Sequence, residues 1–339
     1  MNSRQIPIYF TFDNNYVIPA AVAFWSLLDR TKSNVKWEMK VLHHDITSEN
    51  QALLASIVDR SGKGRLEFVD TGDFLMREWA ANNWEGHQTR HQFTADTVVR
   101  CFGARFFPQY DKIIYSDVDV VFADDVSELY DVDVSNAYIA GVRNVLMKHS
   151  AYELSHLDET NYMRLKDSYL AGGIWVMNLK KIREDNLEQR MMEIINDDSI
   201  VKRWNDQDVI NIACAGKVGF LPLNYISYPY LLSYLEHAEF KSHFSREELY
   251  DSILHPKIIH YASKKPWKQI VEYGEQWWTI CDYLGLSRPG CRNSLLSQRE
   301  MSMQEEVRRL RLVRRGLLLV VGLMAIMWGV SLFFFLNLW

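Results

Sequence analysis

The sequence predicts an α/β protein with a mixed, mostly parallel sheet flanked by helices, followed by a C-terminal transmembrane helix. Two features predict the sheet: strand and helix patterns alternate along residues 1–180, and 48% of the 339 residues are apolar, enough for a large core. A third feature predicts the membrane helix, which is an uncharged run of 21 residues at 316–336.

Runs rich in β-branched and aromatic residues predict the strands of the first half. They lie at residues 6–12, 35–43, 65–71, 112–118, 138–142 and 174–179. Between the early strands, apolar residues recur with a helical period at 19–29, 48–60 (capped by Ser48) and 93–107. This alternation favours parallel strands, and such sheets bind ligands beyond the carboxyl ends of their strands.

The second half continues with predicted helices at 180–197 and 206–215 and a strand at 218–222. The tyrosine-rich stretch 224–245 has little periodicity and fits either an acceptor-binding lid or a surface insertion. "KIIHYAS" at 257–263 predicts a last strand. We therefore assign residues 1–291 to one domain.

The C-terminal segments are basic and then apolar. Residues 292–315 hold seven Arg and three Glu, a charge of +4, and predict a juxtamembrane helix, although a merely solvated helix is the alternative. The segment 316–338 contains the uncharged run, about 32 Å long as a helix, which a buried soluble helix would also fit. Arginines before this segment predict that the body stays in the cytoplasm.

Several classes of protein are disfavoured. The total charge of −5 leaves −9 on residues 1–291, so we expect no nucleic-acid partner. Neither G-x-G-x-x-G nor G-x-x-x-x-G-K-[ST] is present, which disfavours dinucleotide dehydrogenases and P-loop NTPases. The four cysteines form no C-x-x-C pair, and free thiols are expected, with a Cys281–Cys291 bridge left open.

The run "IIYSDVDVVF" places Asp117 and Asp119 in or after an apolar strand. Two residues apart in a strand, their carboxylates would project to the same side and repel unless a cation lay between them. Carboxylate oxygens suit Mg²⁺ or Mn²⁺, which can clamp a diphosphate. Alternatively, the strand ends at Tyr115 and both aspartates are solvated turn residues.

Other polar residues follow predicted strands. "IIHYASKKPW" places His260 at a strand end, where it either completes a metal site or is structural, with Lys264 or Lys265 available to neutralise phosphate. "YFTFDNNY" places Asp13 and Asn15 after the first strand, where such a sheet would hold a nucleoside.

Four segments together resemble glycosyltransferase family 8, the retaining enzymes that include lipopolysaccharide galactosyl- and glucosyltransferases. In order they are "FTFDNNYVIPAAVAFWSLL", "TADTVVRCFGARFFPQYDKIIYSDVDVVF", "GGIWVMNLKKIR" with "NDQDVIN", and "IIHYASKKPW". The similarity covers residues 6 to about 268. It implies a GT-A fold, a UDP-sugar donor and Mn²⁺, or Mg²⁺, held by Asp117, Asp119 and His260.

The resemblance also implies roles for single residues. Nucleotide binding would fall to Thr11, Phe12, Asp13, Asn15, Asp117 and Lys265. Arg100 would hold donor hydroxyls or phosphate, and Asp206, Gln207 and Asp208 would surround the transferring sugar. Two departures leave the donor and acceptor open, because the family often has Asn at Ala171 and Asp at Asn144. The His…Lys-Pro-Trp loop is also a residue short and lacks the usual glycine.

The chemistry follows from charge, since the metal and Lys265 would stabilise departing UDP. Retention through a covalent intermediate needs a nucleophile; Gln207 is poor, and Asp206 is better but could instead orient donor hydroxyls. A front-face reaction, in which the leaving phosphate helps deprotonate the acceptor, needs no such carboxylate and is preferred.

Two other functions stay open. A haloacid-dehalogenase-type phosphatase would use Asp117 as nucleophile and Asp119 as acid/base, but that motif normally follows the first strand. A tail-anchored scaffold would bind nucleotide-sugar without turnover. For the transferase, the basic segment and span predict a lipid-linked glycan acceptor such as lipopolysaccharide core, at the cytoplasmic face of the bacterial inner membrane.

Overall fold

The structure is a computed structural model that describes residues 3–81, 95–145, 154–231, 235 and 242–287. The chain divides into two compact units, and every element below belongs to the first, residues 1–266 with 271–286. No helix in the described ranges has the length and hydropathy of a membrane span. The predicted segments 292–315 and 316–338 lie outside those ranges, as does Cys291.

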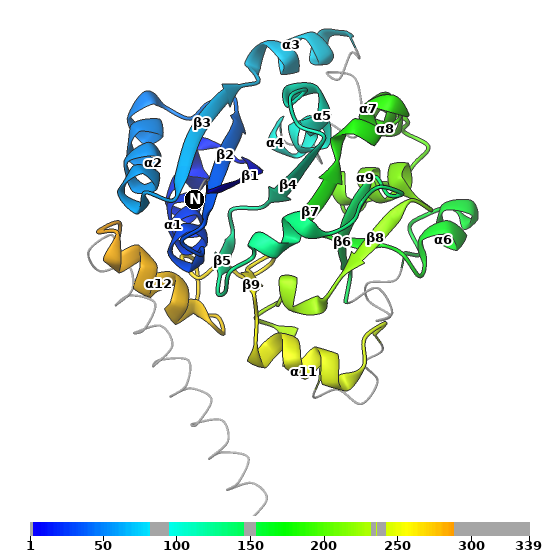
Figure 1. Cartoon of the computed structure of the whole chain (residues 1–339). Coiled ribbons are helices and arrows are strands. Elements are labelled where there is room, and N and C mark those ends of the chain that lie inside the picture. Colours follow the sequence, from blue (N-terminus) through cyan, green and yellow to red (C-terminus); the bar gives the residue numbers. More distant parts are fainter. Residues whose placement is uncertain (1–2, 82–94, 146–153, 232–234, 236–241, 288–339) are drawn as a thin grey trace, which may run out of the picture. The chain divides into compact units, whose positions relative to one another are not determined.

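The main sheet has seven strands in the order β3-β2-β1-β4-β7-β6-β8 (Figure 1). Their bounds are β1 Arg4–Thr11, β2 Val35–His43, β3 Gly64–Asp70, β4 Lys112–Ser116, β6 Ile139–Arg143, β7 Leu170–Asn178 and β8 Val218–Leu221. Only β7 runs against its neighbours β4 and β6; the other pairings are parallel. The predicted mixed, mostly parallel sheet is therefore confirmed.

A second, two-stranded sheet joins distant parts of the chain. β5 (Val120–Phe122) pairs antiparallel with β9 (Ile258–His260), with Val120 opposite His260. The predicted last strand is thus real but does not join the main sheet. Its pairing with β5 brings His260 next to the segment that follows β4.

Helices cover both faces of the main sheet. Their bounds are α1 Val17–Arg30, α2 Ser48–Ser61, α3 Gly72–Ala81, α4 Ala95–Val99, α5 Gly103–Phe106, α6 Glu159–Leu165, α7 Leu179–Glu184, α8 Leu187–Asn196, α9 Asp206–Cys214, α11 Arg246–Leu254 and α12 Gly274–Tyr283. Short 3-10 turns lie at η1 Asn14–Tyr16, η3 Arg100–Phe102, η4 Ser127–Asp131 and η6 Leu223–Tyr225.

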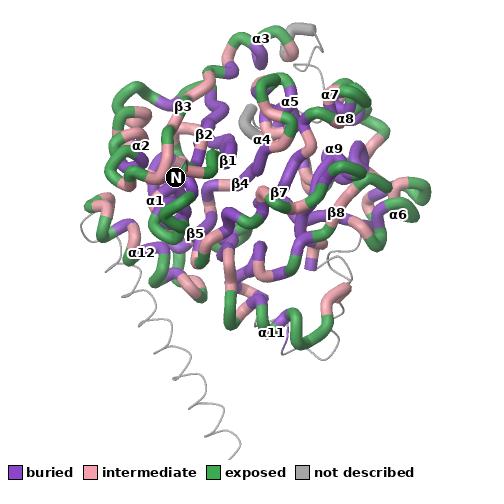
Figure 2. The backbone as a smooth tube through the Cα atoms, viewed as in Figure 1, coloured by how far each residue is buried: buried purple, intermediate pink, exposed green. Residues whose placement is uncertain are grey.

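Strand alternation sorts the core into two clusters. Ile8 and Phe10 of β1 point into the cluster that contains α1 and α2, whereas Tyr9 points into the cluster that contains α5, α7, α8 and α9. This is the two-residue period of a strand buried on both faces. Figure 2 shows the central strands as buried and the outer surface of α2 as largely exposed.

Two predicted helices are interrupted. The segment 180–197 forms α7 and α8, which are separated at Asn186, whose φ is +50°. A helix cannot continue through this left-handed conformation, which Asn tolerates better than most residues. The segment 93–107 contains α4, the 3-10 turn η3 and α5 in succession, so that Arg100 begins the 3-10 turn.

The strand directions fix where polar groups gather. Because β1, β4, β6 and β8 are parallel, their carboxyl ends share one edge of the sheet, and the antiparallel β7 begins at that same edge. Thr11, Ser116 and Leu170 therefore come to the same place in the fold.

Candidate functional site

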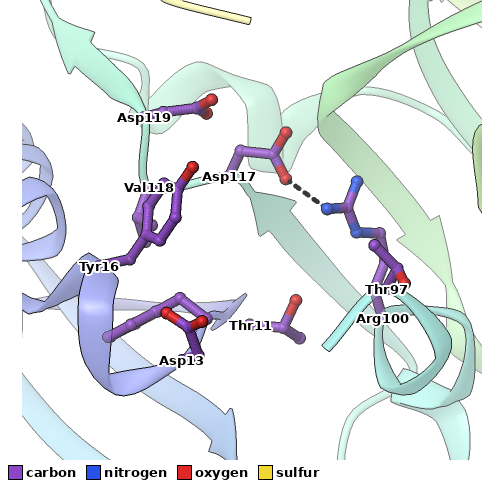
Figure 3. A pocket seen from close by; sticks show the side chains of 9 residues that line it. Thr11, Asp13, Tyr16, Thr97, Arg100, Asp117, Val118 and Asp119 are labelled. Atoms are coloured by element: carbon purple, nitrogen blue, oxygen red, sulfur yellow. Dashed lines mark ion pairs between the residues drawn. The ribbon is translucent and has the colours of Figure 1, made fainter. Parts of the chain in front are cut away.

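A pocket of about 260 Å³ opens at this edge of the sheet (Figure 3). It is lined by Thr11, Phe12, Asp13, Tyr16, Thr97, Arg100, Asp117, Val118 and Asp119. Six of these nine are predicted site residues, and Tyr16, Thr97 and Val118 are not. The sequence could have pointed to two of these three as pocket residues: Tyr16 ends the quoted "YFTFDNNY", and Thr97 lies one helical turn before Arg100.

The two aspartates lie in a turn, not in a strand. β4 ends at Ser116, and the next amide, that of Asp117, donates to the Gly173 carbonyl of β7 at 2.9 Å. Tyr261 then donates its amide to the Asp119 carbonyl, also at 2.9 Å. The prediction of a strand at these two positions is therefore wrong, although both carboxylates do project to one side, toward His260. The solvated-turn alternative is wrong as well, since their side chains are only 16% and 13% exposed.

His260 meets both aspartates. Its Nε2 lies 3.2 Å from Asp119 Oδ1 and 3.5 Å from Asp117 Oδ2. One ligand atom from each of the three residues lies within 4.8 Å of the others. The structure therefore brings together the three predicted metal ligands from the β4–β5 turn and from β9.

Gly173 makes room for the imidazole. Its φ is +109°, and a Cβ at this position would lie 2.6 Å from ring atoms of His260. Only glycine combines this backbone conformation with so close an approach. Tyr228 covers the ring from another direction, with ring centroids 5.6 Å apart.

The cluster fits a divalent metal. Asp119 Oδ1 is buried, makes no regular hydrogen bond in the described part of the chain and faces His260 Nε2 at 3.2 Å, as expected of two atoms that could share an ion. Two carboxylates and one imidazole form a mixed oxygen and nitrogen set that suits a divalent ion such as Mn²⁺.

Arg100 links the cluster to α9. Its Nη2 lies 3.1 Å from Asp117 Oδ1, drawn as the dashed line in Figure 3, and its Nη1 lies 2.8 Å from Asp206 Oδ2. The guanidinium carbon lies 5.1 Å from the centroid of the Tyr115 ring, and the Tyr115 hydroxyl donates to Asp117. The arginine is therefore fixed by charge on two sides and by a ring on a third.

These contacts shift the acidities of the buried groups. Burial raises the pKa of Asp117, but Arg100 and His260 outweigh it and hold that pKa well below its usual range. Burial lowers the pKa of His260, but Asp119 and Asp117 outweigh it and raise that pKa to about 9. For Asp206 burial dominates over Arg100, and the pKa rises to about 6.

At the β1 end of the pocket, Asp13 caps the turn η1. Asp13 accepts from the Asn15 amide at 2.9 Å and from the Asn15 side-chain Nδ2 at 3.2 Å. Asn15 therefore steadies Asp13 and does not itself line the pocket. Thr11 and Phe12 line it.

Lys265 lies beside the aspartates. Its ammonium group pairs with the Asp119 carboxylate and donates to the Tyr261 carbonyl at 2.7 Å and the Ala262 carbonyl at 3.2 Å. A phosphate role for Lys265 stays a prediction.

The residues of "NDQD" contact different parts of the fold. Asp206 reaches Arg100, and Gln207 Oε1 accepts from the Gly172 amide at 2.9 Å. Asp208 is fully buried and bonded to Tyr169 and His156. The prediction that Asp208 surrounds the sugar is wrong, because helix residues two apart point to nearly opposite sides. A helix that starts at residue 206, as the sequence predicts, already implies that Asp206 and Asp208 point to opposite sides.

The two departures from the family pattern lie at the start of β7 and beyond β6. Ala171 is fully buried in the apolar cluster of α1 and α2, so its side chain does not reach the pocket. Asn144 is half-buried, and its amide donates to the Tyr169 carbonyl at 2.9 Å.

Curated relatives are glycosyltransferases. The chain is 27% identical over 221 residues to a putative glycosyltransferase of Haemophilus influenzae, covering 65% of this chain and 62% of that protein. It is 24% identical over 268 residues to an Escherichia coli lipopolysaccharide 1,2-glucosyltransferase, covering 77% and 73%. The chain thus spans less than two thirds of the Haemophilus protein.

Solved structures share the fold. The bifunctional glycosyltransferase WbbM matches with a TM-score of 0.71 at 24% identity, over 88% of this chain and 52% of that one. The galactosyltransferase LgtC, solved with donor and acceptor sugar analogues, matches with a TM-score of 0.65 at 19% identity, over 86% and 100%. These GT-A-like neighbours agree with the expected fold.

The family model of glycosyl transferase family 8 matches residues 7–271. This range contains the whole pocket, the aspartate turn and β9. The match favours sugar transfer over the phosphatase alternative. The chain belongs to glycosyl transferase family 8.

Proposed function

We propose that this glycosyltransferase is a metal-dependent, retaining hexosyltransferase that moves glucose or galactose from a UDP-sugar to a glycan or lipid-linked glycan. One observation carries the proposal. The Asp117, Asp119 and His260 cluster borders the same pocket as the polar end of β1, so a nucleoside and its diphosphate have adjoining places.

The nucleotide would enter over the end of β1. Asp13 offers carboxylate oxygens to a base N–H, and the backbone of Thr11 and Phe12 lies beside it in the pocket wall. Tyr16 adds an aromatic surface to the same wall. These groups suit a uridine, which is flat and carries one ring N–H.

The diphosphate would lie at the aspartate turn. Asp117, Asp119 and His260 would hold Mn²⁺, or Mg²⁺, which neutralises the charge that develops on departing UDP. Lys265 lies beside Asp119 and brings an ammonium group within reach of the same phosphates.

The donor sugar would lie between Arg100 and the first turn of α9. Arg100 forms ion pairs with carboxylates on both sides and orients Asp206, which reaches no other positively charged partner in the described chain. This fixed pairing suits hydrogen bonding to sugar hydroxyls better than nucleophilic attack. It supports a front-face reaction, in which the leaving phosphate assists removal of the acceptor proton.

The proposed acceptor is a membrane glycolipid such as lipopolysaccharide core. Two features support it: the relative named as a lipopolysaccharide 1,2-glucosyltransferase, and the basic segment 292–315 followed by the uncharged run. The proposed location is the cytoplasmic face of the bacterial inner membrane, with 316–338 as a single-pass anchor.

The full-length chain in detergent tests this proposal. UDP release from UDP-glucose and UDP-galactose is measured with Mn²⁺, Mg²⁺ or EDTA, with and without lipopolysaccharide core acceptors. We expect metal-dependent release that one donor and one acceptor accelerate, and a loss of at least about 100-fold in Asp119→Ala. Asp124→Ala, an exposed acid close by, should be neutral.

Two results would count against the proposal. Turnover that is unchanged by EDTA would exclude the metal role. Tight binding of UDP-sugar without release from any donor, with membrane extract present, would favour the non-catalytic scaffold.

A further inference from the structure

We propose that His156, Tyr169 and Asp208 form a buried clamp that orients the first turn of α9. In this way they aim Asp206 at Arg100 and Gln207 at Gly172. That Asp206 and Gln207 bind the donor sugar rests on the proposed function; the clamp itself does not. We define these three residues as the α9 clamp.

Asp208 is the centre of the clamp. It is 0% exposed, and both carboxylate oxygens are engaged. Oδ1 accepts from the Tyr169 hydroxyl at 2.6 Å, and Oδ2 accepts from His156 Nε2 at 3.0 Å and from the Trp204 amide at 2.8 Å. A buried carboxylate with three donors is a strong, geometrically defined anchor.

The bond to Trp204 sets the backbone just before α9. Asn205 has φ +50° and ψ −124°, an uncommon conformation for a residue other than glycine. Such conformations persist only where surrounding contacts determine them. Here the Trp204 amide donates to Asp208, and the Asn205 amide donates to the Lys202 carbonyl at 3.3 Å.

A second set of bonds joins the same helix to the start of β7. Gln207 Oε1 accepts from the Gly172 amide, and Asn211 exchanges two bonds with the Leu170 backbone at 2.7 and 3.0 Å. With Tyr169 on Asp208, three residues at the start of β7, Tyr169, Leu170 and Gly172, each bond a polar side chain of α9. The helix is thereby held in one rotation about its axis.

This rotation decides which side chains face Arg100. Asp206 and Asp208 point to nearly opposite sides of α9, so a fixed Asp208 fixes Asp206. Asp206 Oδ2 then lies 2.8 Å from Arg100 Nη1. A displacement of about 1 Å at such a site can reduce turnover by as much as about 100-fold. Asp208 itself is shielded from the pocket, so we assign it a positioning role.

Conservative and disruptive variants distinguish a positioning role of the α9 clamp from a direct role in sugar transfer. His156→Leu and Tyr169→Phe each remove one donor, whereas His156→Gln keeps a donor. Tyr138→Phe is the matched control, because it removes a similar bond, from the Tyr138 hydroxyl to Asp185 at 2.6 Å, at the opposite end of β6. Amide hydrogen exchange of 204–211, UDP affinity by calorimetry with Mn²⁺, and kcat and KM are measured for each full-length variant.

We expect exchange of the 204–207 amides to rise at least about tenfold in His156→Leu and Tyr169→Phe, and not in Tyr138→Phe. UDP affinity should stay within about twofold of the wild type, while kcat falls about tenfold or more. His156→Gln should restore most of both exchange protection and kcat.

Unchanged exchange at 204–207 in His156→Leu would overturn the clamp, whether or not the chain transfers sugar. A total loss of turnover in Asp208→Asn, with His156→Leu and Tyr169→Phe fully active, would also overturn it and assign chemistry to Asp208. If the wild type shows no turnover but the exchange results hold, the clamp stands and the proposed function fails.

Discussion

Asp117, Asp119 and His260 come from a turn and a short strand and are called here the proposed metal end, whereas Asp206 and Gln207 come from the first turn of a helix and are called the proposed sugar end. The metal end is held by backbone bonds, such as those from the Asp117 amide to Gly173 and from the Tyr261 amide to the Asp119 carbonyl. The sugar end is held by buried side chains, chiefly Asp208, His156 and Tyr169.

This difference predicts how each end responds to substitution. Backbone bonds survive most side-chain changes, so the metal end should fail mainly when a ligand or the glycine behind it changes. Side-chain bonds do not survive, so the sugar end should be sensitive to residues that never touch substrate. Three predictions test this contrast.

The largest effect is expected from Gly173→Ala at the metal end. The new Cβ would lie 2.6 Å from His260 ring atoms, and φ is +109°. We expect unfolding free energy to fall by about 2–4 kcal/mol and Mn²⁺ affinity to fall about tenfold or more. Denaturant unfolding and Mn²⁺ titration by electron paramagnetic resonance measure both.

Gly216→Ala is the control for Gly173→Ala. Gly216 also has a left-handed φ, +83°, but a Cβ there meets nothing within 4 Å. The free energy of unfolding of Gly216→Ala should fall by about 1 kcal/mol, and its Mn²⁺ affinity should stay unchanged. Equal effects in the two variants would mean that backbone strain, and not the His260 contact, explains the result.

A smaller effect is expected from Arg100→Lys, which lies where the two ends meet. Lysine keeps one charge but cannot reach Asp117 and Asp206 with a planar fork. We expect kcat to fall about tenfold, with UDP affinity changed less than about threefold. A matching loss of UDP affinity would place the main role of Arg100 at the phosphates.

The last prediction concerns the pH dependence of stability at Asp206. Its pKa rises to about 6, mainly through burial, so the protonated form favours the folded state. That stabilisation is complete below the unfolded pKa near 4 and is lost as pH rises through about 6. Relative to the wild type, Asp206→Asn should therefore gain up to about 3 kcal/mol between pH 4 and pH 7.

Urea unfolding at several pH values measures this difference. Asp59→Asn, which removes an exposed carboxylate, should show no comparable trend. A difference that shrinks as pH rises would show that Arg100 outweighs burial, so that the sugar end resembles the metal end in its charge balance.

Local sequence patterns were sufficient for the sheet and for most of the metal end. Periods of two and of about 3.6 residues identified the strands and helices, and the carboxyl ends of parallel strands necessarily share an edge. Asp13, Asp117 and Asp119 follow parallel apolar strands, so their meeting was predictable without coordinates, whereas His260 ends β9 outside the main sheet and reaches them only through the pairing of β9 with β5.

Tertiary contacts decided what these patterns left undetermined. β4 ends at Ser116, just before the aspartates, and β5 lies outside the main sheet, where it pairs with β9. The burial of Asp208 away from the pocket likewise depends on Tyr169 and His156, which are 39 and 52 residues away. A short segment fixes its own periodicity, but where a strand ends and how a helix is rotated depend on hydrogen bonds from residues distant in the sequence, which local sequence does not encode.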